Sequence, residues 1–176
     1  MNMVLKKIIK YICIVLNNVI LSFITPLEPP LGSYIRYAYY RLRLKKCGGY
    51  FFSGSGFFIE CPEHVSIGKN CSFNRGVFIS ATNEITIGDN VLIGPYCVLR
   101  DANHIYANRS IPIREQGHTD GKIVIGDDVW LGSHVVVLRN VTIGSHSVIA
   151  AHSLVNKPVP SYEVWGGIPA KYIKKR

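Results

Sequence analysis

The chain has 176 residues, of which 48% are hydrophobic, and its formal net charge is +9 at neutral pH. This length suits a single domain. Twenty Lys and Arg oppose 11 Asp and Glu, and the excess lies mainly near the two ends. No nucleic-acid-binding motif accompanies these basic ends, so they favour anionic lipid head groups or phosphates as partners over nucleic acid.

The chain begins with an apolar stretch over residues 8–27, which Lys10, Asn17 and Asn18 interrupt. Its uncharged part, residues 11–27, is near the lower length limit for a membrane-spanning helix. No small-residue cleavage site of a signal peptide follows. The pattern favours a helix that lies on the cytoplasmic face of a membrane or packs on its own solenoid, with a cap helix and a true span as alternatives.

Pro26, Pro29 and Pro30 end this stretch, and residues 33–47 are predicted to form a basic, aromatic helix. Residues 1–50 are therefore predicted to form an N-terminal apolar and basic helical segment in contact with the membrane. The five Cys are odd in number and lack paired spacing, which indicates reduced thiols in a cytoplasmic protein. The expected location is the cytoplasm, at the inner face of the cell membrane.

An apolar residue recurs at every sixth position through most of the remaining chain. The recurring residues are Ile67, Phe73 and Ile79, then Ile87, Ile93, Leu99 and Ile105, and finally Ile125, Leu131, Val137, Ile143, Ile149 and Val155. A fixed short period indicates a solenoid, whereas a helix would need a period of about 3.6 residues. Cys71 and Cys97 fall at small inward positions of this repeat and are predicted to be buried.

Three six-residue units form one triangular coil of about 18 residues, and each side of the coil is a short parallel strand. The apolar residues point inward and stack on their counterparts in the next coil. Asn70, Asn90 and Asn140 stand where the tight corners require positive φ. The sequence therefore predicts an all-β solenoid over residues 51–176, with a short N-terminal helical segment and a C-terminal tail.

The period is lost between Ile105 and Ile123, so residues 105–122 are predicted to leave the coil as a protruding loop. His104 stands where the regular coil gives way to this loop. Imidazole is a base at neutral pH, which makes His104 a candidate general base beside a surface cleft. His118 is its rival within the loop, and Asp101 and Glu115 are candidates to orient the His104 ring.

Three further histidines, His134, His146 and His152, all stand three places after an inward residue. This spacing predicts that they line up on one corner of successive coils. Such a row resembles a metal-binding ladder, but exposed corner residues are the preferred interpretation, and no metal site is predicted.

Several segments together resemble a known family: the repeats, the loop after "DANH", the run "IVIGDDVWLGSHVVVLRNVTIGSHSVIAAHSLVNKPVP" and the ending "GGIPAKYIKK". They are similar to hexapeptide-repeat acyltransferases, within them to the maltose and galactoside acetyltransferase branch and its polysaccharide O-acetyltransferase relatives. The resemblance covers about residues 55–176 and leaves out residues 1–50. It implies a left-handed parallel β-helix that works as a homotrimer with acetyl-CoA.

The resemblance also implies an activity, O-acetyl transfer from acetyl-CoA to a sugar hydroxyl of a surface polysaccharide or its precursor. His104 matches the family's general base, which assists direct attack of the hydroxyl on the thioester through a tetrahedral intermediate. Asn74 matches an Asn that helps to hold the acceptor. Asn103 falls at an inward place of the repeat and is expected to support the same site.

In the family, acetyl-CoA binds in the groove between neighbouring subunits. The matching positions are Trp130 near the acyl end, Ser133, Ala151, Asn156 and Lys157 along the pantetheine and adenine, and Lys171 and Lys174 near the CoA phosphates. The family often has Arg at the last two places, so a weaker or different phosphate contact is expected here.

Other functions stay open at this point. A xenobiotic acetyltransferase and an N-acetyltransferase acting on an amino sugar are the enzymatic alternatives, because sequence does not distinguish the acceptor atom. A scaffold without catalysis and a zinc carbonic anhydrase share the repeat, but the latter needs three converging His. The expected partners are two further copies of the chain, a carbohydrate acceptor and a membrane surface that residues 1–50 contact.

Overall fold

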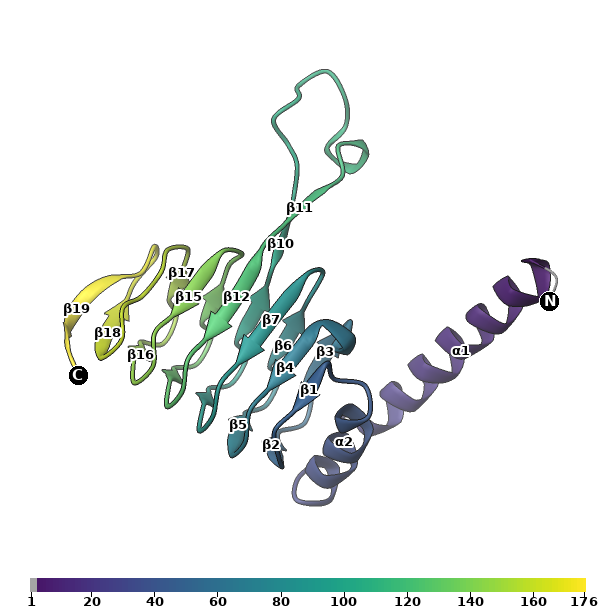
Figure 1. The fold of residues 1–176 in the computed structure, drawn as a ribbon, viewed down its shortest axis with the longest axis horizontal. Helices are drawn as coiled ribbons and strands as arrows, with labels where there is room; N and C mark the ends of the chain where they lie inside the picture. The colour runs from purple at the N-terminus through teal and green to yellow at the C-terminus, as the bar shows by residue number, and fades with distance from the viewer. Residues whose placement is uncertain (1–2) are drawn as a thin grey trace.

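The computed structural model describes residues 3–176, without the side chains of several residues before Val15. Helices α1 (Met3–Ile24) and α2 (Leu31–Arg41) precede a stack of coils whose strands form three largely parallel sheets (Figure 1). Residues 1 and 2, part of the predicted N-terminal segment, lie outside the described residues. The coils confirm the predicted all-β solenoid and are consistent with a left-handed β-helix.

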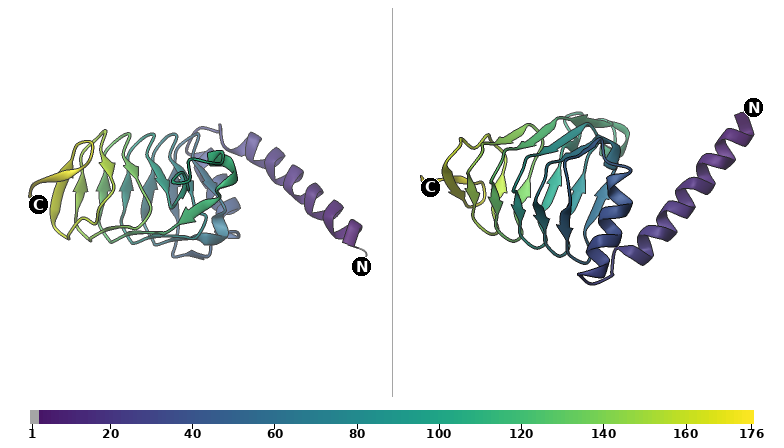
Figure 2. Two further views of the ribbon diagram at one scale, coloured as in Figure 1. Left: turned by 90° about the horizontal axis from the view of Figure 1, so that it is seen from above. Right: turned by 60° about the horizontal axis from the view of Figure 1, so that its bottom comes forward.

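Each regular coil contributes one strand to each sheet, so the sheets form the sides of the solenoid (Figure 2). The first sheet contains β1 (Lys46–Cys47), β4 (Val65–Ile67), β7 (Glu84–Ile87), β12 (Lys122–Ile125) and β15 (Val141–Ile143). The second contains β2 (Phe51–Ser53), β5 (Cys71–Phe73), β8 (Leu92–Ile93), β13 (Trp130–Leu131), β16 (Val148–Ile149), β18 (Glu163–Gly166) and β19 (Lys171–Lys175). The third contains β3 (Phe58–Glu60), β6 (Phe78–Ser80), β9 (Val98–Arg100), β14 (Val136–Val137) and β17 (Leu154–Val155).

The core consists of columns of inward side chains, one from each coil. In the first sheet, Ile67, Ile87 and Ile125 are register partners, and each is at most 2% exposed. Each fully buried aliphatic side chain contributes about 1.5–3 kcal/mol relative to exposure, so the repeated columns stabilise the whole stack. The six-residue period found in the sequence therefore corresponds to successive inward positions of the core.

Tight turns join the sheets, and the predicted corner residues lie in them. Asn70, Asn90 and Asn140 have φ of 57°, 58° and 61°, which confirms the prediction. We call the turn between the second and third sheets the second-to-third corner, and the turn between the third and first sheets the third-to-first corner. The latter is longer in the early coils: five residues separate Ile79 from Ile85, whereas three separate Val137 from Val141. These two extra residues explain the shift in the sequence period.

The solenoid begins one coil before the first residue of the predicted period. In this first coil, made by β1, β2 and β3, Phe51 and Phe57 fill inward places. Their rings lie 5.5 and 5.0 Å from the ring of Phe73 in the next coil. Aromatic side chains thus replace the aliphatic repeat at the closed end of the core.

Arg36 on α2 joins the helices to this first coil. Its guanidinium is fully buried and donates hydrogen bonds to the carbonyl oxygens of Leu27 and Ser53, each at 2.6 Å, and of Ile24 at 2.9 Å. A buried charge is tolerated where it is hydrogen-bonded in this way. Arg36 therefore fixes the end of α1 and the following turn onto the solenoid.

Helix α1 extends away from the solenoid (Figures 1 and 2). Only its last turns pack on the rest of the described chain, where Leu21 and Ile24 are each 8% exposed. Among the residues that the structure describes, no helix is long and apolar enough to cross a membrane.

The thiols of Cys71 and Cys97 are buried and unpaired, as predicted, and burial raises the pKa of each to about 11. Cys47 and Cys61 are also unpaired, and the side chain of Cys13 lies outside the described part of the chain.

Candidate functional site

The protruding loop leaves the solenoid at the third-to-first corner, between β9 and β12 (Figure 1). Its base is an antiparallel hairpin of β10 (Ala102–His104) and β11 (His118–Asp120). A short 3₁₀ helix, η2 (Ile113–Glu115), lies within the loop, and another, η1 (Pro62–His64), lies at the same corner in the first coil. The loop therefore begins at Ala102, and the prediction that Ile105 is an inward residue is wrong, because Ile105 is 38% exposed.

The hairpin places the two candidate bases opposite each other. His104 and His118 are register partners, and their ring centroids are 4.2 Å apart. Both side chains are exposed to solvent at the base of the loop. The site therefore contains a pair of adjacent imidazoles rather than two separated candidates.

His104 lines a cavity of about 440 Å³ together with Arg100, Asn103, Tyr106 and Ile113. Asn103 is half-buried in this wall rather than inward in the coil, because the chain has already left the solenoid at this point. The sequence did not single out Tyr106 and Ile113, because the loop carries no period that predicts its folding. The candidate general base, an amide and a guanidinium thus line one cavity.

Asp101 supports the base of the loop from inside. Its carboxylate is fully buried and accepts backbone N–H hydrogen bonds from Thr82, Asn83 and Glu84 at 2.7–2.8 Å. The expectation that Asp101 orients the His104 ring is therefore not met. Asp101 instead fixes the extended corner of the preceding coil beneath the loop.

A second group of predicted residues lies on the second sheet and its second-to-third corner. Asn74 follows β5 at this corner, and Ser133 and Ala151 occupy equivalent corner places in consecutive coils. The backbones are close here: a Cβ added to Gly132 would lie 2.6 Å from the Ala151 amide nitrogen. Trp130 is 53% exposed on the outer face of the second sheet.

Trp130 is part of an apolar stripe. Its register partners are Leu92 on β8 and Val148 on β16. The three side chains line a groove of about 340 Å³, which Arg176 and Asp128 also border. This groove combines an aromatic surface with a cation.

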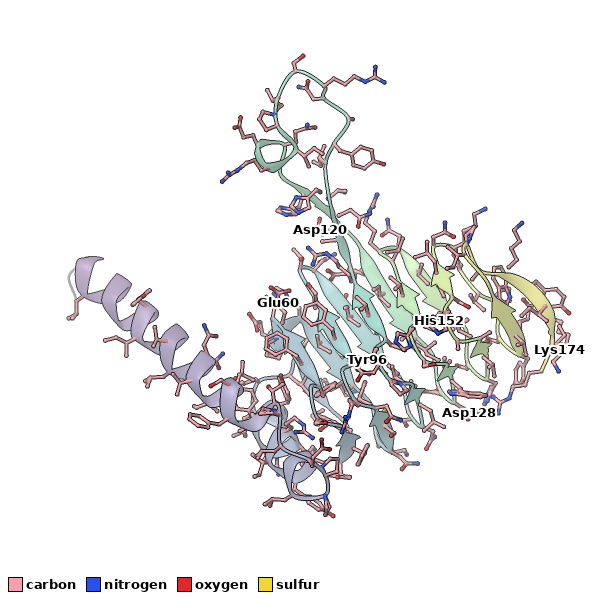
Figure 3. All side chains as sticks on the ribbon, turned by 180° about the vertical axis from the view of Figure 1, so that it is seen from behind. Glu60, Tyr96, Asp120, Asp128, His152 and Lys174 are labelled. Carbon is pink, nitrogen blue, oxygen red and sulfur yellow. The ribbon has the colours of Figure 1, made fainter. Side chains whose placement is uncertain are left out.

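The remaining predicted residues occupy two places. Asn156 and Lys157 follow β17 and are exposed at the third-to-first corner, the same corner as His104. Lys171 and Lys174 are exposed on β19, the antiparallel edge strand beside β18 (Figure 3 labels Lys174). Both ammonium groups are therefore accessible to an anionic ligand in solution.

The predicted site residues therefore form two groups within one chain. His104, Asn103, Asn156 and Lys157 lie at or beside the third-to-first corner, and the other six lie on the second sheet or its second-to-third corner. The third sheet separates the two corners. One chain does not bring the candidate base His104 together with Asn74, Ser133 or Ala151.

The predicted row of three histidines is wrong in part. His134 and His152 stack on the second-to-third corner with ring centroids 4.7 Å apart, and Tyr96 continues this row. His146 lies on the corner between the first and second sheets, where it bonds the Asp128 carboxylate at 3.0 Å. This contact and Arg176 lower the pKa of Asp128. Among the side chains that the structure describes, no three His, Cys, Asp or Glu converge as metal ligands.

Comparison with known proteins agrees with this architecture. The family described as bacterial transferase hexapeptide (six repeats) matches residues 122–157. Galactoside O-acetyltransferase of Escherichia coli is 35% identical over 133 residues, which are 69% of this chain and 62% of that enzyme. The putative lipopolysaccharide biosynthesis O-acetyl transferase WbbJ of the same species is 32% identical, over 73% of this chain and 70% of its own.

A solved structure is similar over most of both chains. The hexapeptide-repeat-containing acetyltransferase of Vibrio cholerae, complexed with acetyl-CoA, has a TM-score of 0.73 and 34% identity and covers 84% of this chain and 80% of its own. The chain spans less than two thirds of the length of some curated relatives, and 37% of one of them. The shared repeat, coil geometry and identity show that the chain belongs to the hexapeptide-repeat acetyltransferases.

Proposed function

We propose that this chain transfers an acetyl group from acetyl-CoA to a sugar hydroxyl of a surface polysaccharide or its precursor. The observation that carries the proposal is the cavity at the base of the loop, where His104 lies beside Asn103 and Arg100. A base with polar neighbours on a water-accessible surface suits deprotonation of a polyhydroxylated acceptor. Relatives named for galactoside and lipopolysaccharide O-acetylation support the acceptor class.

In the proposed mechanism, His104 removes the proton of an acceptor hydroxyl while its oxygen attacks the acetyl carbonyl carbon. Acetyl-CoA is a substrate here and supplies the acetyl group as a thioester. The tetrahedral oxyanion collapses as the carbon–sulfur bond breaks, and the thiolate that leaves takes the proton back from His104. No covalent acyl-enzyme is needed, and Cys71 and Cys97 are unsuited to form one because they are buried, with pKa values of about 11.

The surface of the second sheet fits the proposed binding of acetyl-CoA. The Trp130 stripe offers an apolar wall for a narrow acyl and pantetheine chain, and the small side chains of Ser133 and Ala151 leave the corner backbone open to it. Lys171 and Lys174, exposed on β19, would attract the CoA phosphates as compact cations. These residues therefore form the proposed CoA cradle.

The separation of base and cradle favours a site shared between copies. We propose that the third-to-first corner of one protomer meets the second-to-third corner of the next in a homotrimer. Such head-to-tail contacts close into a ring when the rotation is one third of a turn. His104 of one copy would then face the cradle of its neighbour, with Asn74 from that neighbour beside the acceptor.

We also propose that residues 1–50 hold the catalytic solenoid, residues 51–176, at an anionic membrane surface. At about 100° per residue, the exposed apolar residues of α1 occupy one half of the helix, opposite Leu21 and Ile24. They are Leu5, Tyr11, Ile12, Val15, Leu16, Val19, Ile20 and Phe23, each 42–71% exposed. Residues 1–50 also carry eight Lys or Arg and one Glu, which favours an anionic lipid surface as the occupant of this face.

Vesicle co-sedimentation tests this membrane contact. Wild-type protein is expected to pellet with phosphatidylglycerol-containing vesicles and less with pure phosphatidylcholine, and added salt should weaken the binding. The double variant Val19→Glu and Phe23→Glu should lose binding, whereas Val124→Glu on the first sheet should retain it. Equal binding by all three proteins would refute the contact.

The proposed activity is tested by thiol release from acetyl-CoA in the presence of sugars, oligosaccharides, bacterial polysaccharide, amino sugars and hydroxylated antibiotics. Release that depends on a sugar hydroxyl and is lost in His104→Ala supports the proposal. Release that depends only on an amine or an antibiotic would assign the chain to one of the alternative acetyltransferases. Absence of acetyl-CoA binding would refute acetyl transfer itself.

A further inference from the structure

A further cavity lies at the same third-to-first corner as His104, but in the first coil of the solenoid. It has a volume of about 740 Å³ and lies between α1, the end of α2 and the first coil. Its lining residues are Asn17, Asn18, Leu21, Tyr39, Arg43, Phe58, Ile59, Glu60, Cys61, Pro62 and Glu63. We call it the α1 cavity. Five of these eleven residues come from residues 1–50.

The α1 cavity and the His104 cavity have lining residues on β3 and β9, the two strands that flank β6 in the third sheet. Glu60, which lines the first, is the register partner of Ser80, and Ser80 is the partner of Arg100, which lines the second. The Ser80 hydroxyl donates a hydrogen bond to the Glu60 carboxylate at 2.6 Å. Neighbouring strands are about 4.8 Å apart, so Glu60 and Arg100 are separated by roughly 10 Å. Figure 3 shows Glu60 on the solenoid edge between α1 and the protruding loop.

The lining of the α1 cavity suits a neutral ligand with many hydroxyl groups. Asn17, Asn18 and the carboxylate of Glu60 present hydrogen-bonding groups, and Glu63 and Arg43 carry opposite charges. Tyr39 is held in place, because its hydroxyl donates to the Asn17 side chain and Arg43 lies 3.8 Å over its ring. Two carboxylates disfavour a lipid chain or a polyanion here.

Aromatic surface accompanies these polar groups. Phe58, at the cavity wall, stacks on Phe78 with ring centroids 5.9 Å apart and ring planes 5° from parallel. Sugar rings expose C–H faces that pack on aromatic rings, while their hydroxyl groups bond carboxylates and amides. A lining of this mixed character indicates a carbohydrate subsite.

We propose that the acceptor is an oligosaccharide that runs along this edge, with its reacting sugar at His104 and later sugars in the α1 cavity. This inference rests on the proposed function and names its acceptor more closely. Because Glu60 and Arg100 lie two strand spacings, roughly 10 Å, apart, a ligand that contacts both must be about as long as a disaccharide. Glu60 is a specificity residue for the distal sugars and does not touch the reacting hydroxyl.

Cys61 offers a readout that does not depend on activity. Its thiol is exposed and lies in the wall of the α1 cavity, whereas Cys47 lies on the first sheet outside it. We expect a neutral oligosaccharide, chosen as the strongest binder on an array of one- to six-sugar glycans, to slow alkylation of Cys61 by iodoacetamide at least about threefold. Alkylation of Cys47, followed by mass spectrometry in the same sample, should not change.

Variants separate this subsite from catalysis. Glu60→Ala and Asn18→Ala should raise KM for the oligosaccharide by about tenfold, because hydrogen bonds to a charged group or an amide contribute on this scale. Their kcat/KM for the single terminal sugar should stay within about twofold of wild type. Glu84→Gln is the matched control, since its carboxylate pairs with Lys45 and Lys122 and lines neither cavity. A melting curve for each variant checks folding.

Several results would overturn the proposal. Preference for single sugars, unchanged KM in both variants, or Cys61 alkylation that no glycan slows would each refute it while leaving acetyl transfer intact. Burial and the nearby carboxylates of Glu63 and Glu60 raise the pKa of the Cys61 thiol, so alkylation is run at alkaline pH. Cys61 that still resists alkylation there in the trimer, but reacts once the protein is unfolded, would show that the cavity is already filled, which also refutes the proposal. Glycan protection of Cys61 in His104→Ala, which lacks the proposed base, would support the subsite even if no acetyl transfer is found.

Discussion

Replacement of His104 by Ala is the most direct test of the proposed chemistry. The side chain is exposed at the loop base and lies outside the core columns, so the free energy of unfolding should change by less than about 0.5 kcal/mol. General-base catalysis contributes about 10²–10⁴-fold, equivalent to about 3–5 kcal/mol of transition-state stabilisation. We therefore expect kcat to fall by this factor while the protein stays folded.

His118 provides an internal comparison for this loss. Its ring lies 4.2 Å from that of His104, and aromatic contacts of this kind contribute about 0.5–1.5 kcal/mol. If His118 only supports the His104 ring, His118→Ala should reduce kcat by no more than about tenfold. The double variant should then be no slower than His104→Ala alone, because the supported group is already absent.

The assay is thiol release from acetyl-CoA with a hydroxyl acceptor, measured for the wild type and the three variants at equal protein concentration. Circular dichroism and the trimer fraction serve as controls for folding. A loss of more than about a hundredfold in His118→Ala with less than tenfold in His104→Ala would move the base to His118. Near-normal rates in both single variants would refute general-base catalysis by this hairpin.

Two further predictions concern stability. Arg36→Met should destabilise the protein by about 2–6 kcal/mol in urea unfolding, because the buried carbonyl oxygens of Ile24 and Ser53 lose their donor, at about 1–3 kcal/mol each. An unchanged midpoint would contradict the proposed role of Arg36 in fixing the helices to the first coil. Hydrogen bonds from Lys122 and Lys45 lower the pKa of Glu84 from 4.5 to about 2. A lowered folded-state pKa gives stability that is complete above about pH 4.5 and is lost as the pH falls towards 2. The melting temperature of Glu84→Gln should therefore fall less on acidification than that of the wild type. Equal decreases in the two proteins would show that the ion pairs of Glu84 do not contribute to stability.

The sequence predicts the solenoid well because each coil must place an apolar side chain in the same column. That requirement repeats at a fixed spacing and is visible without any structure, as are the Asn corners at positive φ. The first coil is not predicted from this period, because Phe51 and Phe57 fill its core with aromatic rings instead of aliphatic side chains. Ile105 fits the spacing and yet is exposed, because the chain turns into the hairpin at Ala102 before reaching it.

For the candidate site, the sequence predicts individual residues but not how they are brought together. Loss of the period locates His104, but nothing in the loop sequence specifies the pairing of β10 with β11 that brings His118 to it. The α1 cavity depends on how α1 packs against the third sheet. Arg36 fixes the end of α1 through hydrogen bonds to backbone carbonyl oxygens, and such contacts follow no sequence period. Contacts between segments far apart in the sequence, such as these, cannot be predicted from the spacing of apolar residues.

The division of site residues between two corners leads to a quantitative prediction about mixed trimers. Let one chain carry His104→Ala and another carry Ala151→Trp, which fills the exposed corner of the CoA cradle without entering the core. Each homotrimer should be inactive. In a head-to-tail ring, a site is competent when the base comes from the second variant and the cradle from the first.

Random reassembly of equal amounts should give about one quarter of all interfaces this combination, so activity should recover to about a quarter of wild type. A site contained within one chain would never be repaired by mixing, because every chain carries a lesion. Combining both lesions in one chain and mixing it with wild type supplies the control, since that mixture should also retain about a quarter of wild-type activity. Recovery near zero in the first mixture, with about half in the control, would place base and cradle in the same protomer and refute the shared site.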